Sequence, residues 1–524
     1  MTITGQQFIG NRRSAKGTTT FYSGNNNTHT FYEATQQEID EAAQKAHDAF
    51  LVYRNFPGNI KAIFLETIAS GIKAARNELL SVAMQETFLA ESRLNGEINR
   101  TINQIKLFAN LLKEGSWVNA IIDTAQPNRT PLRKPDIRQM QKAIGAIAVF
   151  GASNFPFAFS TAGGDTIAAF AAGCTVVYKA HPGHPILSEM VAQIIIDATE
   201  KNNMPDGIFS MMQAASIQPA TYLVQHPLVK AIAFTGSFKG GKSIYDMAAK
   251  RAEPIPVYAE MGSINPVFIL PEIMKQKSED IAKALAASNM VSAGQFCTNP
   301  GIIIASDNED AENFQLSFSS AIANANSEIM LTNAIHNSYQ QNIDKLSKSN
   351  VVTLVKKGND PDKKNAAQPN MFIVSAEKFI SDNELHKEVF GPFSLHVHAK
   401  NKEELMNIAK SLQGQLTITI WGTENDIADY NELINYLELK AGRIIINNVP
   451  TGVEVTHAMM HGGPYPATTD SKFTSVGSTA IYRFTRPVCY QNFTDRFLPE
   501  ELKNKNSLNI VRMINDEYTK NKIE

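Results

Sequence analysis

Cysteine is scarce in this chain, and the three residues present, Cys174, Cys297 and Cys489, do not form a CxxC pair. A disulfide framework or a metal site built from thiolates needs more cysteines at closer spacing. The sequence therefore excludes both kinds of structure. Each cysteine is either a small buried apolar residue or a reactive thiol.

An excess of charge of one sign and long apolar runs are lacking as well. The chain has 49 Lys and Arg against 51 Asp and Glu, for a net charge of −2. Without a basic stripe, nucleic acid and an anionic membrane surface are poor candidates for partners. No segment reaches the roughly 18 uninterrupted apolar residues of a membrane span, and the N-terminal segment lacks the apolar centre of a signal peptide. We therefore expect a cytoplasmic protein.

Two common catalytic motifs, HExxH and GxSxG, are absent from the sequence. Their absence removes the motif support for a metalloprotease and a serine hydrolase. The chemistry of the protein must come from other residues.

The apolar pattern predicts an α/β fold with more than one domain. At 524 residues the chain exceeds what one hydrophobic core supports. Apolar residues at helical spacing from 38 to 113 predict a run of helices. Strands and helices then alternate up to residue 262, which is typical of a doubly wound parallel sheet, and a second alternating region runs from about 281 to 448. The predicted strands of the first region are 143–151, 174–180, 208–212, 231–237 and 257–262, and its helices are 157–173, 185–199, 218–225 and 242–252.

Several segments outside these regions also carry a prediction. The extended pieces 130–144 and 483–493 are too isolated to stand alone, so we expect them to pair with each other or with another subunit. The polar segment after Leu498 is predicted to be a helical tail. Residues 24–27 and 356–365 have the composition of exposed loops.

Cys297 is the sharpest candidate for chemistry. It lies in SAGQFCTNPG, directly after a helical pattern, among small and turn-forming residues that leave a thiol accessible. A lone cysteine is more often a buried apolar residue, which fits Cys174 in the apolar strand CTVVY. A thiol needs a local base or oriented amides to raise its thiolate fraction at neutral pH.

Two further residues follow predicted strands, where an α/β sheet faces its ligand crevice. Glu260 closes the strand IPVYAE. Desolvation there is expected to raise the pKa of its carboxyl group toward the range of a general base. Asn154, in the loop FGASNFPF, could donate a hydrogen bond to an oxyanion. Taken singly, a surface carboxylate and an ordinary loop Asn are the commoner explanations.

The remaining candidates concern phosphate and metal binding. GSFKGG, at Gly236 to Gly241, lies between a strand and a helix, so its amides could face a pyrophosphate. Lys179 ends a strand and could face a ribose or a phosphate. His181 and His184 have the spacing of a metal pair, but no further ligand is near, and we predict no metal site.

Together these segments resemble the aldehyde dehydrogenase superfamily, and the resemblance covers about residues 38–493. The matching pieces, in order, are FGASNFPF, VVYKAHPGHP, FTGSFKGG, AEMGSINP, GQFCTNPG and KEVFGPF. Four further segments, AGGDTIAAFAAG, HGGPYPATTD, FTSVG and RPVCYQNF, resemble the sequences of one branch of this superfamily. That branch contains α-ketoglutaric semialdehyde (2,5-dioxovalerate) dehydrogenases and a related bacterial fatty-aldehyde dehydrogenase.

The resemblance implies a role for each matching residue. Cys297 is implied to be the nucleophile, Glu260 the general base and Asn154 the oxyanion donor. The implied reaction oxidises α-ketoglutaric semialdehyde to 2-oxoglutarate through a thiohemiacetal and a thioester on Cys297. The residues implied to bind the cofactor are Lys179, His181, Gly236, Ser237, Gly241, Glu388 and Phe390.

One departure from the family pattern bears on the cofactor. Members that prefer NAD commonly carry Glu three residues after the lysine that ends the strand, and here that position is Pro182. No carboxylate is left to repel a 2′-phosphate, while Lys179 and His181 are close in sequence. We therefore predict NADP as the preferred cofactor, with NAD as a second option.

The resemblance also implies a domain organisation. Residues 1–129 and 147–257 are expected to form a cofactor-binding α/β domain, and residues 258–465 a catalytic α/β domain. Residues 130–146 and 466–497 are expected to form a small β oligomerisation element of a homodimer or homotetramer, followed by a tail at 498–524.

Three alternatives stay open at this point. The first is the same chemistry on medium- or long-chain aliphatic aldehydes. The second is a non-catalytic protein on the same scaffold, because a fold alone does not guarantee function. The third is a cysteine hydrolase, for which the sequence offers no His partner that can be located.

Overall fold

The computed structural model describes residues 1–23, 29–306 and 309–524. The exposed loop predicted at 24–27 lies outside these residues. The predicted run of helices is confirmed in the N-terminal part. The first helix begins at Thr35, where the side chains and backbone amides of Thr35 and Glu38 bond reciprocally in a capping box. These helices are α1 (Gln36–Tyr53), α2 (Gly58–Ala74), α3 (Arg76–Thr87) and α4 (Glu91–Glu114).

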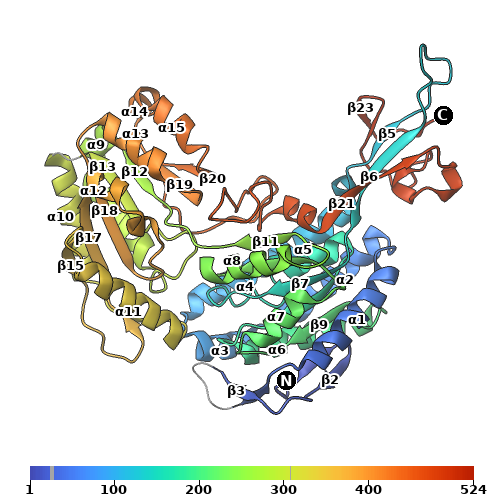
Figure 1. Cartoon of the computed structure of the whole chain (residues 1–524), viewed down its shortest axis with the longest axis horizontal. Coiled ribbons are helices and arrows are strands. Elements are labelled where there is room, and N and C mark those ends of the chain that lie inside the picture. The colour runs from blue at the N-terminus through green and yellow to red at the C-terminus, as the bar shows by residue number, and fades with distance from the viewer. Residues whose placement is uncertain (24–28, 307–308) are drawn as a thin grey trace.

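A first sheet with the order β11-β10-β7-β8-β9-β1-β2 forms the centre of this part (Figure 1). The five strands from β11 to β9 are parallel, and β1 and β2 extend the sheet as antiparallel strands. Its strands are β1 (Gln7–Ile9), β2 (Arg12–Ser14), β7 (Ala146–Phe150), β8 (Thr175–Lys179), β9 (Phe209–Met212), β10 (Val229–Thr235) and β11 (Val257–Glu260), and the helices between them are α5 (Gly164–Ala172), α6 (Pro185–Lys201), α7 (Gln218–Gln225) and α8 (Phe238–Ala249).

The register of the parallel strands brings their carboxyl ends to one edge of the sheet. Phe150 at the end of β7 pairs with Lys179 at the end of β8. On the other side, Thr235 at the end of β10 pairs with Glu260 at the end of β11. Lys179 and Glu260 therefore lie on the same edge, where α/β sheets bind ligands.

Two helices begin at residues other than those predicted, for local reasons. The segment 157–163 is not helical, and α5 begins at Gly164. The carboxylate of Glu97 accepts hydrogen bonds from the amides of Phe157 and Ala158 and holds this segment as turns. Helix α8 begins four residues earlier than predicted, because the Ser237 hydroxyl caps it by accepting from Gly240 N.

A second α/β unit follows, with the sheet order β15-β17-β18-β13-β12-β19-β20, and it lies beside the first in Figure 1. All its strands are parallel except β15. The strands are β12 (Val267–Ile269), β13 (Ile302–Ser306), β15 (Thr353–Lys357), β17 (Asn370–Ser375), β18 (Phe393–Ala399), β19 (Gln415–Trp421) and β20 (Ala441–Ile446). The helices are α9 (Pro271–Met290), α10 (Glu309–Ala323), α11 (Asn333–Ser347), α12 (Ala376–Ser381), α13 (Lys402–Ser411), α14 (Glu424–Asp429) and α15 (Asn431–Leu437).

The two predicted extended pieces pair with each other. β6 (Ile137–Ala143) and β21 (Thr485–Gln491) are antiparallel along their whole length. They belong to a third sheet, of order β21-β6-β5-β22-β23, that projects from the rest of the molecule in Figure 1. The strand predicted at 143–151 therefore belongs to two strands. Ala143 is the last residue of β6 in this sheet, and Ala146 is the first residue of β7 in the first sheet.

The prediction of a helical tail is wrong. After Leu498 the chain forms a short 3-10 helix at Glu500–Leu502 and the strands β22 (Arg512–Ile514) and β23 (Glu517–Thr519), and β22 pairs with β5 (Ile121–Asp123). The reason is Arg512, whose fully buried guanidinium donates hydrogen bonds to the carbonyls of Lys503 and Asn521. Arg512 therefore ties two parts of the tail together.

Short elements complete the described chain, namely β3 (Thr20–Tyr22), β4 (Thr30–Tyr32), β14 (Glu328–Ile329), β16 (Ala366–Ala367) and 3-10 turns at Ser116–Val118, Asn383–His386, Ser478–Phe484 and Asp495–Phe497. Residues 358–365 form the predicted loop, and most of them are exposed. In the part of the chain that the structure describes, no helix is both long and apolar enough for a bilayer crossing.

Candidate active site

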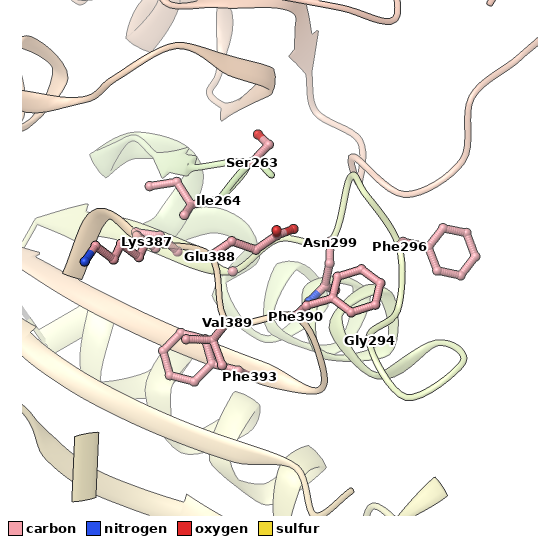
Figure 2. A pocket seen from close by; sticks show the side chains of 12 residues that line it. Ser263, Ile264, Gly294, Phe296, Asn299, Lys387, Glu388, Val389, Phe390 and Phe393 are labelled. Carbon is pink, nitrogen blue, oxygen red and sulfur yellow. The ribbon is translucent and has the colours of Figure 1, made fainter. Parts of the chain in front are cut away.

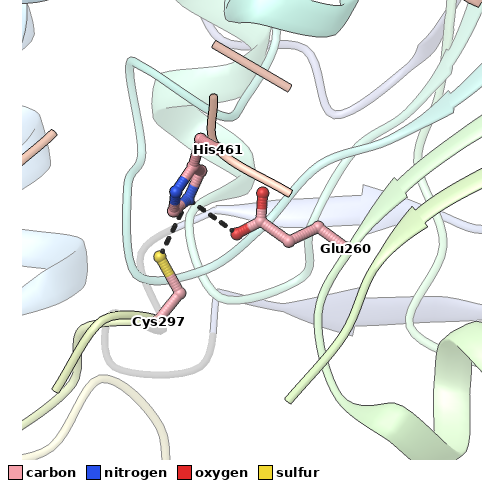
Figure 3. A group of neighbouring side chains, drawn as sticks. All are labelled: Glu260, Cys297 and His461. Carbon is pink, nitrogen blue, oxygen red and sulfur yellow. Dashed lines mark hydrogen bonds and ion pairs between the residues drawn. The ribbon is translucent and has the colours of Figure 1, made fainter. Parts of the chain in front are cut away.

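Three side chains from distant parts of the chain meet at the carboxyl edge of the first sheet (Figure 3). Sγ of Cys297 lies 3.4 Å from Nε2 of His461, and the same nitrogen lies 3.1 Å from Oε1 of Glu260. Glu260 is the last residue of β11, Cys297 lies in the loop between α9 and β13, and His461 lies in the loop after β20. Glu260 and His461 are buried, and Cys297 is half-buried.

His461 is the residue that the sequence analysis missed. It stands 164 positions from Cys297 in the chain, and its one signal is its place at the start of HGGPYPATTD. The statement that no His partner could be located for Cys297 is therefore corrected. Both contacts use Nε2, however, whereas a nucleophile–His–acid triad uses opposite ring nitrogens. The arrangement is a shared contact and not such a triad.

The loop before Cys297 is sharply bent. Ser292, Ala293 and Gly294 have φ values of 54°, 55° and 64°. The left-handed region is unfavourable for residues with a Cβ, so the backbone is strained at Ser292 and Ala293. At Gly294 a Cβ would lie 2.2 Å from the carbonyl oxygen of Gly391, so only glycine fits. This bend follows Met290, the last residue of α9, and presents Cys297 beside Glu260.

The electrostatics of the site keep the thiol protonated at rest. Burial raises the pKa of Cys297 well above its ordinary value, and the negative charge of Glu260 raises it further. Attack by this thiol therefore requires that its proton move to a neighbour. The nearest ring nitrogen is Nε2 of His461.

The expectation that burial raises the pKa of Glu260 is corrected. Burial does act in that direction, but the opposing effects of His461, Ser475 and Cys297 are larger in sum, and the pKa of Glu260 is lowered. The hydroxyl of Ser475 donates to Oε2 of Glu260 at 2.6 Å, and the amide of the same residue donates to His461 O. Glu260 is therefore an ionised carboxylate at neutral pH, ready to accept a proton.

Asn154 lies next to the cysteine loop. It follows β7, it is buried, and its Nδ2 donates to the carbonyl of Gln295 at 3.2 Å, two residues before Cys297. The backbone carbonyl of Asn154 accepts a hydrogen bond from Nη2 of Arg93 at 2.6 Å. The structure therefore places Asn154 beside the loop that carries Cys297.

Glu388 and Phe390 lie in the loop before β18 and line a small pocket with Ser263, Phe296 and Asn299 (Figure 2). Figure 2 shows the side chains of Lys387 and Glu388 pointing in opposite directions. Burial raises the pKa of Glu388 to about 8, the amide of Ser263 lowers it and Glu260 raises it. A Cβ at Gly262 would lie 2.5 Å from Oε2 of Glu388, so a side chain at that position would displace the carboxyl group.

The other predicted cofactor residues lie along the same sheet edge. Gly236 directly follows β10, and its amide donates to Glu260 O. Ser237 caps α8, and at Gly241 a Cβ would lie 2.6 Å from Cγ of Met261. Lys179 ends β8. The strand and the helix predicted on either side of GSFKGG are confirmed, and α8 begins inside this segment, at Phe238.

The charges around Lys179 differ in two ways from those expected from the sequence. Burial lowers the pKa of Lys179 to about 8, and the carboxylate of Glu33 raises it, so a carboxylate is present after all. Glu33 is already engaged, since it accepts hydrogen bonds from the amides of Ala215 and Ser216 and from the Ser216 hydroxyl. His181 is neutral, because burial and the neighbouring His184 hold its pKa well below its ordinary value. It adds no positive charge.

His184 does not act with His181 as a metal pair. Its Nε2 contacts the carbonyl of Ala152 at 2.9 Å, and its Nδ1 contacts the Ser188 hydroxyl at 3.2 Å. Both ring nitrogens are therefore used within the fold. His181 Nδ1 accepts a hydrogen bond from Gly183 N.

Cys297 opens on a cavity of about 530 Å³. One wall is a face of α4, where Arg93, Gly96, Glu97 and Arg100 follow each other at helical spacing. The rings of Phe155, Phe159 and Phe296 and the loop 448–454 complete the lining. The sequence pattern did not single out Arg93 or Arg100, because arginines on an amphipathic helix are typical of a solvated face.

Solved structures of other proteins share the fold of this chain. A 1-pyrroline-5-carboxylate dehydrogenase aligns with a TM-score of 0.76 at 19% identity, over 93% of this chain and 92% of that chain. A betaine aldehyde dehydrogenase of Staphylococcus aureus, solved in complex with NAD+, aligns with a TM-score of 0.79 at 18% identity, over 94% and 97%. At these identities the likeness concerns the fold alone.

Sequence comparison goes further. The chain is 44% identical over 523 residues to the alpha-ketoglutaric semialdehyde dehydrogenase of Acinetobacter baylyi, which covers 99% of both chains. It is 43% identical over 483 residues to alpha-ketoglutaric semialdehyde dehydrogenase 2 of Azospirillum brasilense, over 92% of both. The model of the aldehyde dehydrogenase family matches residues 18–483. With a match of this length and relatives at this identity, the chain belongs to the aldehyde dehydrogenase family.

Proposed function

We propose that this protein oxidises α-ketoglutaric semialdehyde (2,5-dioxopentanoate) to 2-oxoglutarate with a nicotinamide cofactor. The observation that carries the proposal is the thiol of Cys297 on the wall of a cavity of about 530 Å³, with His461 and Glu260 beside it. The choice of substrate is supported by the two relatives that are 44% and 43% identical and carry this name.

The reaction begins with the thiol of Cys297. His461 Nε2 takes its proton, and the sulfur attacks the aldehyde carbon to form a C–S bond. The aldehyde oxygen becomes an oxyanion in this adduct. The Nδ2 group of Asn154 and the backbone amide of Cys297 donate hydrogen bonds to it, an interaction of about 3 kcal/mol when the donors are held in place.

The residues at the sheet edge fit a dinucleotide. Glu388 has a carboxyl group whose hydrogen-bond donor in the described chain is the amide of Ser263, so it has acceptor capacity for a ribose diol. Lys179, His181 and the turn from Gly236 to Gly241 would hold the adenosine half, and Phe390 would pack against the nicotinamide ribose and ring. When bound, the cofactor supplies the hydride acceptor that turns the adduct into a thioester.

Glu260 completes the reaction. The carboxylate takes a proton from a water molecule, and the resulting hydroxide attacks the thioester carbon. The C–S bond breaks, the carboxylic acid leaves, and the sulfur recovers its proton. The lowered pKa of Glu260 keeps this group ionised and available at neutral pH.

We further propose that NADP is preferred over NAD. Pro182 stands where a carboxylate would repel a 2′-phosphate, and Glu33 is occupied by three donors of residues 215 and 216. Lys179 supplies the positive charge. Comparison of kcat/KM for the two cofactors tests this preference, and an excess for NAD would overturn it.

The test of the proposed function is the initial rate of cofactor reduction with 2,5-dioxopentanoate beside hexanal at equal concentration. A large excess in kcat/KM for the keto acid supports the proposal. The reverse order would show an oxidiser of aliphatic aldehydes, for which the phenylalanines of the cavity would be the substrate contacts. The absence of thiol-dependent oxidation of either aldehyde would indicate a non-catalytic protein.

We also propose that the third sheet joins copies of this chain into a homodimer or homotetramer. β21 is an edge strand that pairs with β6 on one side, and much of it is exposed. An unpaired edge of this kind is a template for pairing with another chain. Light scattering of the intact protein tests the proposal, and a monomer at micromolar concentration would overturn it.

A further inference from the structure

The arginines of the large cavity differ in how far they are committed to the fold. Arg93 donates to the carbonyl of Asn154 at 2.6 Å and lies 3.8 Å from the carboxylate of Glu97. Arg443 donates to the carbonyls of Pro450 and Gly452 at 2.7 and 3.1 Å. Both therefore hold the loops that build the cavity.

Arg100 has no such commitment. Within residues 1–23, 29–306 and 309–524, its guanidinium donates no hydrogen bond and forms no ion pair, and its Nε is buried without a partner. The ring centroids of Phe155 and Phe159 lie 5.7 and 5.1 Å from the guanidinium carbon. These rings hold the cation in place and leave its donors free. A buried guanidinium without a partner is costly unless a ligand supplies one.

The position of Arg100 relates it to the reacting groups. It lines the cavity on which Cys297 opens, one turn along α4 from Gly96, whose missing side chain leaves open space. Burial lowers the pKa of Arg100, whereas the acidic groups of Glu97, Cys297, Glu260 and Glu454 raise it, so these groups are near neighbours. Glu97 is itself engaged by the amides of Phe157 and Ala158.

We infer that Arg100 binds the carboxylate of the substrate and selects aldehydes that carry one. A guanidinium binds a carboxylate through two parallel hydrogen bonds, which fixes the far end of a short chain while the aldehyde end faces Cys297. Arg93 then acts as a positioning residue, because it holds the loop of the oxyanion donor Asn154. The inference rests on the proposed function and names the residue that sets its substrate class.

The test compares 2,5-dioxopentanoate with pentanal, which has the same number of carbons and no carboxylate. In Arg100→Met, we expect kcat/KM for the keto acid to fall by roughly 30-fold or more, because the substrate carboxylate loses its partner in a partly dry site. The value for pentanal should stay within about threefold. Arg100→Lys keeps the charge and loses the two parallel hydrogen bonds. Its kcat/KM for the keto acid should therefore lie between those of wild type and Arg100→Met.

Two further measurements keep the inference open to refutation. Lys106→Met removes a positive charge from the exposed face of the same helix and should change neither substrate. Binding of the product 2-oxoglutarate, measured by calorimetry on the intact protein, should be lost in Arg100→Met and kept in Lys106→Met. If Arg100→Met does not fold, as circular dichroism would reveal, Arg100→Lys and Arg100→Gln take its place.

The outcomes separate this inference from the proposed function. If the wild-type protein prefers pentanal, the substrate assignment itself fails. If the wild type prefers the keto acid and Arg100→Met loses both substrates equally, or loses neither, the assignment stands and the role of Arg100 is wrong. The same conclusion follows if 2-oxoglutarate binds to Arg100→Met as well as to wild type.

Discussion

Nε2 of His461 lies between Sγ of Cys297 and Oε1 of Glu260, at 3.4 Å from the first and 3.1 Å from the second. One nitrogen therefore faces both the group that must lose a proton and the group that must later take one from water. Protonation of His461 by the thiol would place a cation beside the carboxylate. In the proposed reaction the proton of the thiol goes to His461 and the proton of water goes to Glu260, and these two acceptors are in contact.

Replacement of His461 by Asn should lower kcat/KM by about 100-fold, the usual contribution of a positioned base. Without that base, attack depends on the thiolate already present, so activity should rise with pH toward the raised pKa of Cys297. The pH profile of kcat/KM checks this. His457→Asn, on the exposed part of the same loop, is the matched control. An unchanged pH profile in His461→Asn would show a merely structural role.

Replacement of Cys297 by Ala should abolish aldehyde oxidation, because the C–S bond cannot form. The thermal unfolding midpoint should change little, since Cys297 is half-buried and the substitution removes a single sulfur atom. Steady-state rates and calorimetry check both statements. Cys489→Ala, which alters an exposed thiol, should behave like wild type. Wild-type turnover in Cys297→Ala would remove the proposed nucleophile.

Glu260→Gln should separate the two halves of the reaction. The thioester still forms, but no carboxylate remains to take the proton from water, so a burst of reduced cofactor should precede slow turnover. Rapid mixing of the variant with excess aldehyde and cofactor measures this burst. Its size should approach one molecule of reduced cofactor per active site. A linear time course without a burst would place Glu260 before the thioester.

NADP binding should weaken as the pH rises through about 8. Burial lowers the pKa of Lys179 to about 8, so its ammonium is charged below that pH and neutral above it. Only the charged form attracts a 2′-phosphate. The dissociation constants of NADP and NAD, measured by protein fluorescence between pH 6.5 and 9, check this prediction. In Lys179→Met the pH dependence should vanish, and an equal dependence for both cofactors would contradict the assigned contact.

Arg512→Met should loosen the C-terminal tail. The guanidinium is fully buried and donates to the carbonyls of Lys503 and Asn521, and hydrogen bonds from charged groups are each worth about 1.5–3 kcal/mol. The local opening free energy of β22 should fall by about 3 kcal/mol, measured by amide hydrogen exchange. Arg496→Met, an exposed neighbour, should leave the exchange unchanged. Equal protection in both variants would show that Arg512 does not hold the tail.

The parts that could be predicted from the sequence are those with short-range signals. β8 was predictable because a strand covered on both faces is a continuous apolar run. Cys297 and Glu260 stand in local patterns next to predicted elements. His461 and Arg100 could not be found in this way, because their importance arises from contacts with residues far away in the chain. The tail was misjudged because its strands have three residues each, too few to show an alternating pattern, and depend on Arg512.

The order of the first sheet has a consequence for altering the protein. Lys179 ends β8 and Glu260 ends β11, and β7 and β10 lie between these strands. Three strand spacings separate the two ends, or about 14 Å at about 4.8 Å each. Substitutions at the tip of β8 are therefore too remote to disturb the thiol and its proton acceptors. The choice between the two cofactors can be re-engineered as a separate module, while the chemistry at the other end of the edge stays as it is.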